Sequence, residues 1–396
     1  MREPRAQLAW LSLAMFFGMT LWFSATAATA SIVGELHLTT AEAAWLTMAV
    51  QGGFVVGTLV SAVFTLPDIV NPRRLFAAGC LVGATTNAAL VVTGAPAALI
   101  GLRVMTGAAL AWVYPPGMKI AAGWFERRRG TALGILIGAL TVGSAFPHLL
   151  AAASAVLPWR DLMLAASALA LAGGAVVLTA VGDGPYVTNS VRFEPSAIAR
   201  VFSERGTRLA TLGYLGHMWE LYAVWTWIAT FAAASLAARG GARGATFVTG
   251  PLASGVAFLT IACGAFGSAA AGLFADRVGK ARVAAWAMLV SGTCAALAGI
   301  VYARSPVLLV GLAVVWGVAV VADSGQLSAL VAEHSPRDHV GTALTVQTCS
   351  GFLLTMASIR LVPMVAANAG WEWAFACLVP GPLLGALALR GLITPP

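Results

Sequence analysis

Titratable side chains lie inside otherwise apolar stretches of this sequence, where they can carry protons or bind charged solutes. A charge at the centre of a bilayer costs roughly 2.5–3.5 kcal/mol or more, so such a group turns toward a cavity or a partner. The stretch GHMWELYAVWTW, residues 216–227, holds His217 and Glu220 three residues apart, on one face of a helix. Comparable stretches hold Arg103, His148, Asp323 and Arg360.

The pair on residues 216–227 has two interpretations. Glu220 is either a proton carrier or substrate contact, or a structural partner of His217 or of a cavity arginine. Histidine changes charge near neutral pH, so His217 either relays that proton or serves as a plain hydrogen-bonding group.

Asp323 lies in VVADSGQLSAL, which is unusually polar for a membrane segment and also contains Gln326. We expect a second proton or substrate site here, and the alternative is a hydrogen-bond hub where Gly325 loosens the helix. Arg103 either binds a substrate anion or pairs with a carboxylate and so controls its protonation. Arg360 either contacts substrate or extends to the membrane surface. His148 follows Pro147 and is a ligand or a helix–helix contact.

Aromatic side chains are frequent in the same stretches. An aromatic wall suits an apolar, aromatic or cationic substrate. Trp and Tyr also populate membrane interfaces, which is the alternative. The candidates for substrate binding are Trp22, Trp112, Tyr114, Trp219 and Tyr222. The sequence YPPG at 114–117 predicts a kink in its helix, because proline removes a backbone donor.

The composition is that of a membrane protein. The chain has 396 residues, of which 59% are hydrophobic and 10% charged, against about 25% charged in soluble domains. A spanning helix needs about 20 apolar residues. Twelve segments qualify: 8–31, 42–66, 75–94, 97–121, 131–153, 162–182, 208–233, 247–275, 283–303, 307–331, 341–364 and 373–390. The first is longer than a signal-peptide core, so we expect it to be an uncleaved helix.

An internal repeat divides these helices into two parallel six-helix bundles. GTAL at 130–133 recurs at 341–344, and GLRVMTG at 101–107 resembles GLAVVWG at 311–317. The longest polar stretch separates the repeats, which predicts an N-terminal bundle over 1–182, a linker over 183–206 and a C-terminal bundle over 207–396. Parallel repeats of this kind place a binding site between them near the bilayer midplane.

The distribution of basic residues predicts the orientation. Lysine and arginine concentrate in loops on the cytoplasmic side of membrane proteins. With both termini inside, only Arg160, Arg239, Arg243 and Arg304 fall in outer loops. We therefore expect a multi-pass protein of the cytoplasmic (inner) membrane with both termini in the cytoplasm. The net charge of +8 reflects these loops, and we expect no nucleic acid partner.

Several motifs resemble those of the major facilitator superfamily (MFS), and the resemblance covers the whole chain. GLFADRVGKAR at 272–282 resembles its loop signature, here between helices 8 and 9. The first-half counterpart LPDIVNPRRL, 66–75, is degraded. Arg103 matches the fourth-helix arginine, and WFERRRGTALG at 124–134 resembles the loop that follows. The Gly-Pro signature of antiporters is not met, because Gly138 is followed by Ala139.

The resemblance implies roles for helices and loops. Helices 1, 4, 7 and 10 would line a central cavity, helices 2, 5, 8 and 11 would flank it, and helices 3, 6, 9 and 12 would face lipid. Arg103 would take part in proton coupling. Charged residues at the cytoplasmic ends of helices 2 and 8 would hold the two halves closed when the cavity faces outward: Asp68, Arg73, Arg74, Asp276 and Arg277.

These observations predict a secondary active transporter that moves a small solute by alternating access. We expect proton coupling through Glu220, His217, Asp323 and Arg103, and a small organic anion as substrate. The alternatives are an exporter of apolar or cationic compounds, and a non-transporting membrane sensor or assembly factor with the same fold. We expect a monomer without enzymatic activity, cofactor or bound metal, whose partners are the solute, protons and the bilayer.

Overall fold

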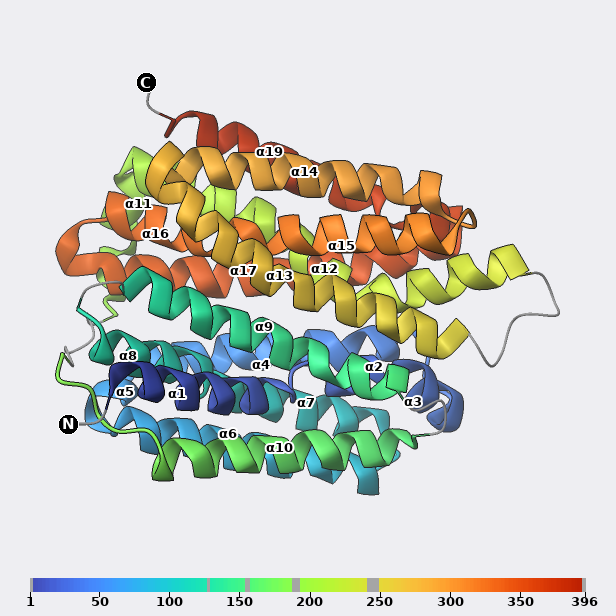
Figure 1. Ribbon diagram of the computed structural model, residues 1–396, viewed down its shortest axis with the longest axis horizontal. Helices are drawn as coiled ribbons and strands as arrows, with labels where there is room; N and C mark the ends of the chain where they lie inside the picture. The colour runs from blue at the N-terminus through green and yellow to red at the C-terminus, as the bar shows by residue number, and fades with distance from the viewer. Residues whose placement is uncertain (1–2, 127–128, 154–156, 187–192, 241–248, 394–396) are drawn as a thin grey trace. The chain divides into compact units, whose positions relative to one another are not determined.

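The computed structural model describes residues 3–126, 129–153, 157–186, 193–240 and 249–393, and the described chain is built of helices (Figure 1). Eleven of its helices are long and apolar enough to cross a membrane. The remaining expected segment, 8–31, is the first along the chain. It is interrupted and forms α1 (Pro4–Met19), α2 (Ser24–Ala27) and α3 (Thr29–Leu36). The all-α membrane fold with twelve crossings is confirmed, but the expectation of one continuous helix over 8–31 is wrong.

The chain divides into two compact units, and each has its own helices. Unit 1 comprises Met1–Pro147 and Leu157–Pro195, and unit 2 comprises His148–Val156 and Ser196–Pro396. Besides α1 to α3, the helices of unit 1 are α4 (Thr40–Val63), α5 (Leu66–Ile69), α6 (Pro72–Ala89), α7 (Pro96–Leu110), α8 (Tyr114–Trp124), most of α9 (Arg129–Ala153) and α10 (Trp159–Thr179).

Unit 2 has the same plan of long helices joined by short connections. Its helices are α11 (Ile198–Ser203), α12 (Arg205–Gly240), α13 (Thr249–Val278), α14 (Lys280–Val301), α15 (Pro306–Ala322), α16 (Ser324–His334), α17 (Val340–Ala369), α18 (Trp371–Ala374) and α19 (Pro380–Arg390). Short 3-10 turns complete several of the connections.

Local sequence sets where the helices begin and break. Proline stands at the start of α1, α6, α7 and α15, where its missing N–H is not needed. The Thr39 and Glu42 side chains form a capping box at the start of α4. The predicted break at YPPG is confirmed, since α7 ends at Leu110 and α8 begins at Tyr114. Helix 10 passes from α15 to α16 at the single residue Asp323, without a proline.

Glycines let the second and fourth helices of each unit approach closely. In unit 1, a Cβ added at Gly107 of α7 would lie 2.1 Å from the Val50 carbonyl oxygen of α4. In unit 2, a Cβ at Gly317 of α15 would lie 2.0 Å from the Thr260 oxygen of α13. Gly107 and Gly317 are 210 residues apart in the sequence, and so are Val50 and Thr260. The motifs at 101–107 and 311–317 have the same offset. The repeat therefore conserves a backbone contact within each unit.

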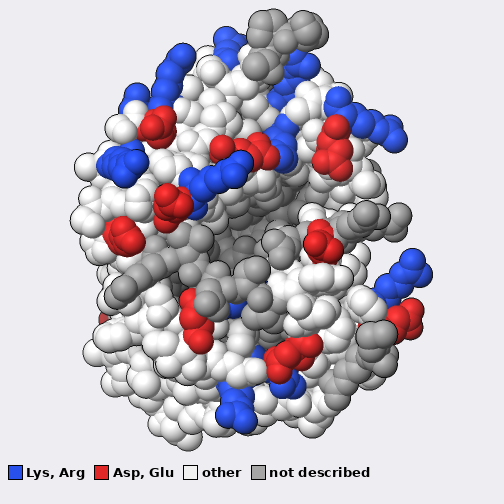
Figure 2. Space-filling view, turned by 90° about the vertical axis from the view of Figure 1, so that its left-hand side faces the viewer, with Lys and Arg blue, Asp and Glu red and all other residues white. Residues whose placement is uncertain are grey.

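Charged side chains gather at helix ends. Figure 2 looks onto the helix ends that lie at the left of Figure 1, and Lys, Arg, Asp and Glu side chains are frequent on this face. In unit 1, the connection between α4 and α6 lies at these helix ends. The sequence predicts that this side faces the cytoplasm.

We expect Gly317→Ala to destabilise the protein by about 1–3 kcal/mol, because the added methyl group forces α15 away from the backbone of α13. The matched control is Gly311→Ala on the same helix, where an added Cβ meets nothing within 4 Å. This control should be neutral or gain about 0.5–1 kcal/mol from helix propensity. Thermal unfolding in detergent measures both, and equal stability of the two variants would contradict the close contact.

Candidate functional site

Arg103 is fully buried in unit 1 and donates hydrogen bonds to the interruption of helix 1. Its Nη2 donates to the Trp22 carbonyl oxygen at 2.6 Å and its Nη1 to the Leu21 oxygen at 3.2 Å. Its Nε donates to the Leu46 oxygen of α4 at 3.0 Å. Because the bilayer core offers no water to free carbonyls, Arg103 supplies the donors that allow helix 1 to break there.

Asn87 extends this network to α10. Its side-chain oxygen accepts from Arg103 Nη1 at 3.2 Å and from the Ser24 hydroxyl at 2.8 Å. Its Nδ2 donates to the Met163 carbonyl oxygen at 3.0 Å and lies 3.1 Å from Ser167 Oγ. The break in helix 1 is therefore tied to α4, α6, α7 and α10 of the same unit.

No carboxylate contacts Arg103 among the described residues. Its positive charge is stabilised by hydrogen bonds to backbone carbonyl oxygens just beyond the C-terminal end of α1, where the helix dipole is negative. A carboxylate partner for Arg103 was one expectation from the sequence, and the described chain places none in contact with it. Its N–H groups point at protein acceptors, which leaves little to offer a substrate anion.

His217 and Asp323 form a buried pair in unit 2. His217 Nδ1 of α12 lies 2.8 Å from Asp323 Oδ1, and both side chains are only 2% exposed. The other ring nitrogen, Nε2, lies 2.9 Å from the Ser324 hydroxyl at the start of α16. Asp323 sits at the break of helix 10, so the pair joins helices 7 and 10 of the same unit.

Glu220 is held by a separate set of partners. Its Oε1 accepts from Trp316 Nε1 of α15 at 2.7 Å, and its Oε2 accepts from the Ser291 hydroxyl of α14 at 2.8 Å. Trp316 packs edge-on against Phe375, with ring centroids 5.2 Å apart. Glu220 and His217 thus share a face of α12, as predicted, but they do not pair with each other. Sequence reasoning missed Ser291 and Trp316, which lie on distant segments.

The aromatic candidates separate into different groups. In unit 1, the ring centroids of Trp22 and Phe54 are 5.0 Å apart, and those of Phe54 and Tyr114 are 6.4 Å apart. In unit 2, Tyr222 lies 5.1 Å from Phe352. Trp219 donates from Nε1 to the Cys377 carbonyl oxygen at 3.0 Å and packs against the last helix. A contact of Trp219 with substrate is thereby disfavoured.

The remaining candidates stand apart from these groups. Gln326 is buried next to the polar break of helix 10. His148 is fully buried, and neither ring nitrogen has a hydrogen-bond partner among the described residues; the same holds for Nε1 of Trp112. Arg360 is half-buried near the end of α17 and forms no ion pair within the described residues.

Some charged residues of the predicted cytoplasmic side have partners inside their own unit. Asp68 pairs with Lys119 of α8, and Arg73 pairs with Asp183 at 2.9 Å. In unit 2, Asp276 and Arg277 are exposed, and the ion pair found nearby joins Lys280 to Glu333.

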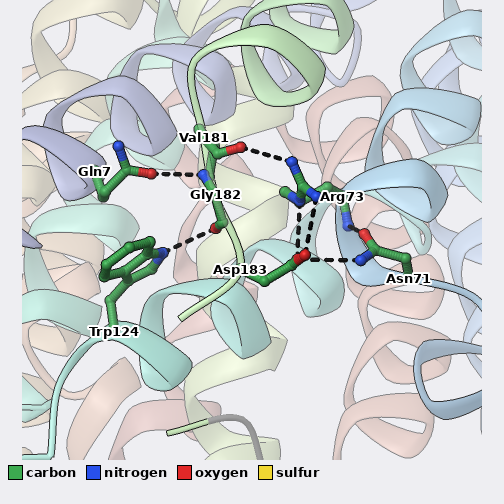
Figure 3. Close-up of polar contacts among 7 residues, drawn as sticks. All are labelled: Gln7, Asn71, Arg73, Trp124, Val181, Gly182 and Asp183. Atoms are coloured by element: carbon green, nitrogen blue, oxygen red, sulfur yellow. Dashed lines mark hydrogen bonds and ion pairs between the residues drawn. The ribbon is translucent and has the colours of Figure 1, made fainter. Parts of the chain in front are cut away.

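A clasp around residues 180–183 fixes the end of α10 in unit 1 (Figure 3). Arg73 Nε and Nη2 donate to the two Asp183 carboxylate oxygens at 2.9 Å each, and its Nη1 donates to the Val181 oxygen at 2.8 Å. The Gly182 N–H donates to Gln7 Oε1 at 2.6 Å, and Trp124 Nε1 donates to the Gly182 oxygen at 3.0 Å. Helices α1, α6 and α8 thus all hold the start of the linker.

The clasp changes the acidity of its carboxylate. Burial alone would raise the pKa of Asp183, but the hydrogen bonds from Arg73 and Asn71 outweigh burial and lower the pKa below its usual range. Asn71 donates from Nδ2 to Asp183 at 3.1 Å while its oxygen caps α6. Asp183 is therefore ionised at neutral pH and stabilises the folded chain in that form.

A second contact holds the other end of helix 1 to α10. The Glu35 carboxylate of α3 accepts from Trp159 Nε1 and from Arg160 Nη1, both at 2.6 Å. Arg160 also lies over the Trp159 ring, 4.4 Å from its centroid. The hydrogen bond from Trp159 has the largest effect on the pKa of Glu35 and lowers it. The hydrogen bond and the charge of Arg160 lower the same pKa further. The interrupted helix 1 is thus attached to α10 at both of its ends.

A family model identifies the family of the chain, and solved structures share its fold. The family model described as Major Facilitator Superfamily matches residues 11–266 and 244–396. The crystal structure of the nucleoside transporter NupG superposes with a TM-score of 0.74 at 15% identity, and a mutant form of it with a TM-score of 0.75. Each comparison covers 98% of this chain and 100% of the other. No curated protein matches the sequence.

We expect Arg103→Lys to destabilise unit 1, because one ammonium group cannot reach all three carbonyls that the guanidinium holds. Each buried carbonyl left without a donor costs about 1–3 kcal/mol. Hydrogen exchange should also accelerate around residues 20–24. The control is Arg360→Lys, a half-buried arginine without an ion pair in the described chain, which should change stability by less than about 0.5 kcal/mol. Wild-type thermal stability in Arg103→Lys would contradict this role.

The Arg73–Asp183 contact should contribute about 0.5–1 kcal/mol at neutral pH, the range of a solvent-screened ion pair. Because the folded pKa of Asp183 is lowered, this contribution is present above the unfolded value near 3.9 and is lost as the pH falls through the folded value. A double-mutant cycle with Arg73→Gln and Asp183→Asn, followed by thermal unfolding, measures the coupling. A coupling that is zero at pH 7, or unchanged in strong acid, would refute it.

Proposed function

The chain belongs to the Major Facilitator Superfamily, and from this premise we propose that it is a secondary active transporter of a small solute, driven by protons. It is a multi-pass membrane protein. In alternating access, two helical repeats rock around a binding site between them. The glycine contacts that recur at an offset of 210 residues support two equivalent repeats.

The observation that carries the proposal is the buried pair of His217 and Asp323. Removing both side chains from water is costly unless they share a proton or a charge. At 2.8 Å the Asp323 carboxylate lies within ion-pair distance of Nδ1, while Nε2 faces the Ser324 hydroxyl. Proton uptake changes the charge of this pair while the two side chains stay in contact. Since Asp323 stands between α15 and α16, a change in this pair can act on the shape of helix 10.

Glu220 supplies a second protonatable site on the next turn of α12. Trp316 Nε1 can only donate, so it keeps its bond to Glu220 in either protonation state. The Ser291 hydroxyl both donates and accepts, and it can turn to receive the proton of a neutral Glu220. These partners tolerate the charge change that a proton carrier needs.

Arg103 takes a different place in the proposal than the family resemblance implied. Its contacts with carbonyls support a structural role at the break of helix 1. The proton chemistry is then assigned to unit 2, with His217, Asp323 and Glu220. The charged residues at the predicted cytoplasmic ends, Asp68, Arg73, Arg74, Asp276 and Arg277, remain our candidates for closing the transporter on that side.

The substrate is a separate question. The similarity to a nucleoside transporter at 15% identity shows a shared fold. By itself it does not identify the substrate of this chain. A small organic anion was expected, but Arg103 is occupied by protein acceptors, which leaves Arg360 as the basic candidate. An exporter of apolar or cationic compounds is the alternative. The orientation with both termini in the cytoplasm, the inner membrane and the monomeric state belong to the proposal as well.

A sensor or assembly factor with this fold is the second candidate function, and the degraded loop signature at 66–75 favours it. Such a protein binds its ligand without moving it. Flux across a membrane therefore separates the two functions.

The test is transport by the purified full-length chain in liposomes, with and without an imposed proton gradient. Radiolabelled benzoate, uracil and tetraphenylphosphonium represent anionic, neutral and cationic solutes. We expect one class to accumulate with the gradient. Asp323→Asn and Glu220→Gln should each reduce that accumulation about fivefold or more, because a coupling between two sites is typically worth about 5- to 150-fold. Both should retain exchange of solute without a gradient.

The control is Asp338→Asn, which removes an exposed carboxylate from the predicted cytoplasmic side and should behave like the wild type. Gradient-driven accumulation at the wild-type level in both Asp323→Asn and Glu220→Gln would refute proton coupling through these residues. Binding of a solute without any flux would support the sensor.

A further inference from the structure

We propose that unit 1 contains a binding site for a flat, uncharged ring molecule with a cyclic amide edge, formed by Gln51 together with Trp22, Phe54 and Tyr114. The proposal deepens the proposed function by naming the class of solute, and it rests on that function only for the statement that the bound molecule is transported. Its basis is the polar face of α4 beside the break of helix 1.

Gln51 has no exposed surface, and neither its side-chain oxygen nor its nitrogen has a hydrogen-bond partner among the described residues. Buried amides are almost always paired, because an unpaired donor or acceptor keeps the full cost of its lost hydration. The oxygen accepts and the nitrogen donates, side by side in one plane. A cyclic amide, with its own adjacent C=O and N–H, is the complementary edge.

The spacing of residues on α4 directs Gln51 toward helix 1. Thr47, Gln51, Phe54 and Thr58 recur at helical intervals and share one face. The Thr47 hydroxyl lies 2.7 Å from the hydroxyl of Thr26 on α2, which fixes the direction of that face. The Thr58 hydroxyl on the same face is buried without a partner in the described chain. This face therefore carries three unpaired polar atoms beside the interrupted helix.

Aromatic rings adjoin the same face. Phe54 follows Gln51 by three residues. Its ring centroid lies 5.0 Å from that of Trp22, and the two ring planes make an angle of 51°. Phe54 also lies 6.4 Å from Tyr114, with the two rings stacked at 25°. Trp22 comes from the break of helix 1 and Tyr114 from the break of helix 4. Ring faces beside a planar amide suit a planar, unsaturated ligand ring.

The charges of unit 1 indicate a neutral ligand. The Arg103 guanidinium lies behind the helix 1 break and donates to Leu21, Trp22 and Leu46 carbonyl oxygens. Within α4, the only ionisable residue is Glu42, in the first turn of the helix. An added carboxylate or ammonium group on the ligand would lose its hydration without gaining a partner.

A buried water is the alternative partner for Gln51, since buried waters commonly satisfy such groups. The experiment separates the two. Uracil is the probe, because it is flat, neutral and carries cyclic amide edges. Dihydrouracil keeps an amide edge but loses the unsaturated ring, and orotate keeps the ring but adds a carboxylate.

The measurement is thermal stabilisation of the purified full-length chain in detergent by each of the three compounds. We expect uracil to raise the unfolding temperature of the wild type, with dihydrouracil and orotate at least tenfold weaker in apparent affinity. Gln51→Leu should lose at least tenfold in apparent affinity for uracil. The matched control is Gln347→Leu in α17, a buried glutamine whose amide is also unpaired within the described residues, and it should bind uracil like the wild type.

The stability of Gln51→Leu without ligand shows that loss of binding is not loss of folding. Because leucine removes unpaired polar atoms from a buried site, this variant should unfold at or above the wild-type temperature. Equal stabilisation of Gln51→Leu and the wild type by uracil would overturn the site. Absence of any uracil effect on the wild type would overturn the ligand class and favour water.

The two proposals fail in different measurements. Asp323→Asn should keep the stabilisation by uracil, because its position in unit 2 lies outside the site. If Asp323→Asn and Glu220→Gln retain proton-driven accumulation, the proposed coupling fails while uracil binding stands. If uracil binding fails while these variants lose proton-driven accumulation of another solute, only the ligand class is wrong.

Discussion

Arg103 donates hydrogen bonds to backbone carbonyls where helix 1 is interrupted, and the interior of unit 1 depends on that contact. A broken helix inside a bilayer leaves backbone groups that lipid cannot satisfy, so the protein must supply donors. Arg103 does so from α7, and Asn87 connects the same network to α10. With the break held open, Trp22 reaches Phe54 and the polar face of α4. An arginine without a carboxylate partner in the described chain is thus explained by the carbonyls that it serves.

The two repeats share a scaffold and differ in their polar interiors. The glycine contacts of Gly107 and Gly317 recur at the repeat offset, since close helix approach tolerates no larger residue. The buried ionisable groups do not recur. Unit 1 places a guanidinium among carbonyls, whereas unit 2 places His217 beside Asp323 and Glu220 beside Trp316. Proton chemistry and recognition of a neutral ring are therefore assigned to different halves of one duplicated fold.

Hydropathy was enough to locate twelve crossings, recurring motifs were enough to find the repeat, and the prolines of YPPG were enough to predict the break, because each of these signals is local in the sequence. The interruption of helix 1 was missed, since residues 20–23 contain no proline or glycine and the break is stabilised by a distant arginine. Helical spacing placed His217 and Glu220 on one face, but their partners come from α14, from α15 and from Asp323 between α15 and α16. Trp219 and Asp183 show the same limit, because long-range packing decides which side chains a residue meets.

Infrared difference spectroscopy of the purified protein, stepped between about pH 8 and about pH 6, tests the central claim most directly, because an ordinary histidine changes charge in this range. The account assigns proton uptake to the carboxyl groups and imidazole of unit 2. It predicts a difference spectrum with buried carboxyl or imidazole bands that Asp323→Asn removes or shifts and Asp338→Asn leaves unchanged. A spectrum without such bands, or one that is identical in the wild type, Asp323→Asn and Glu220→Gln, would contradict it.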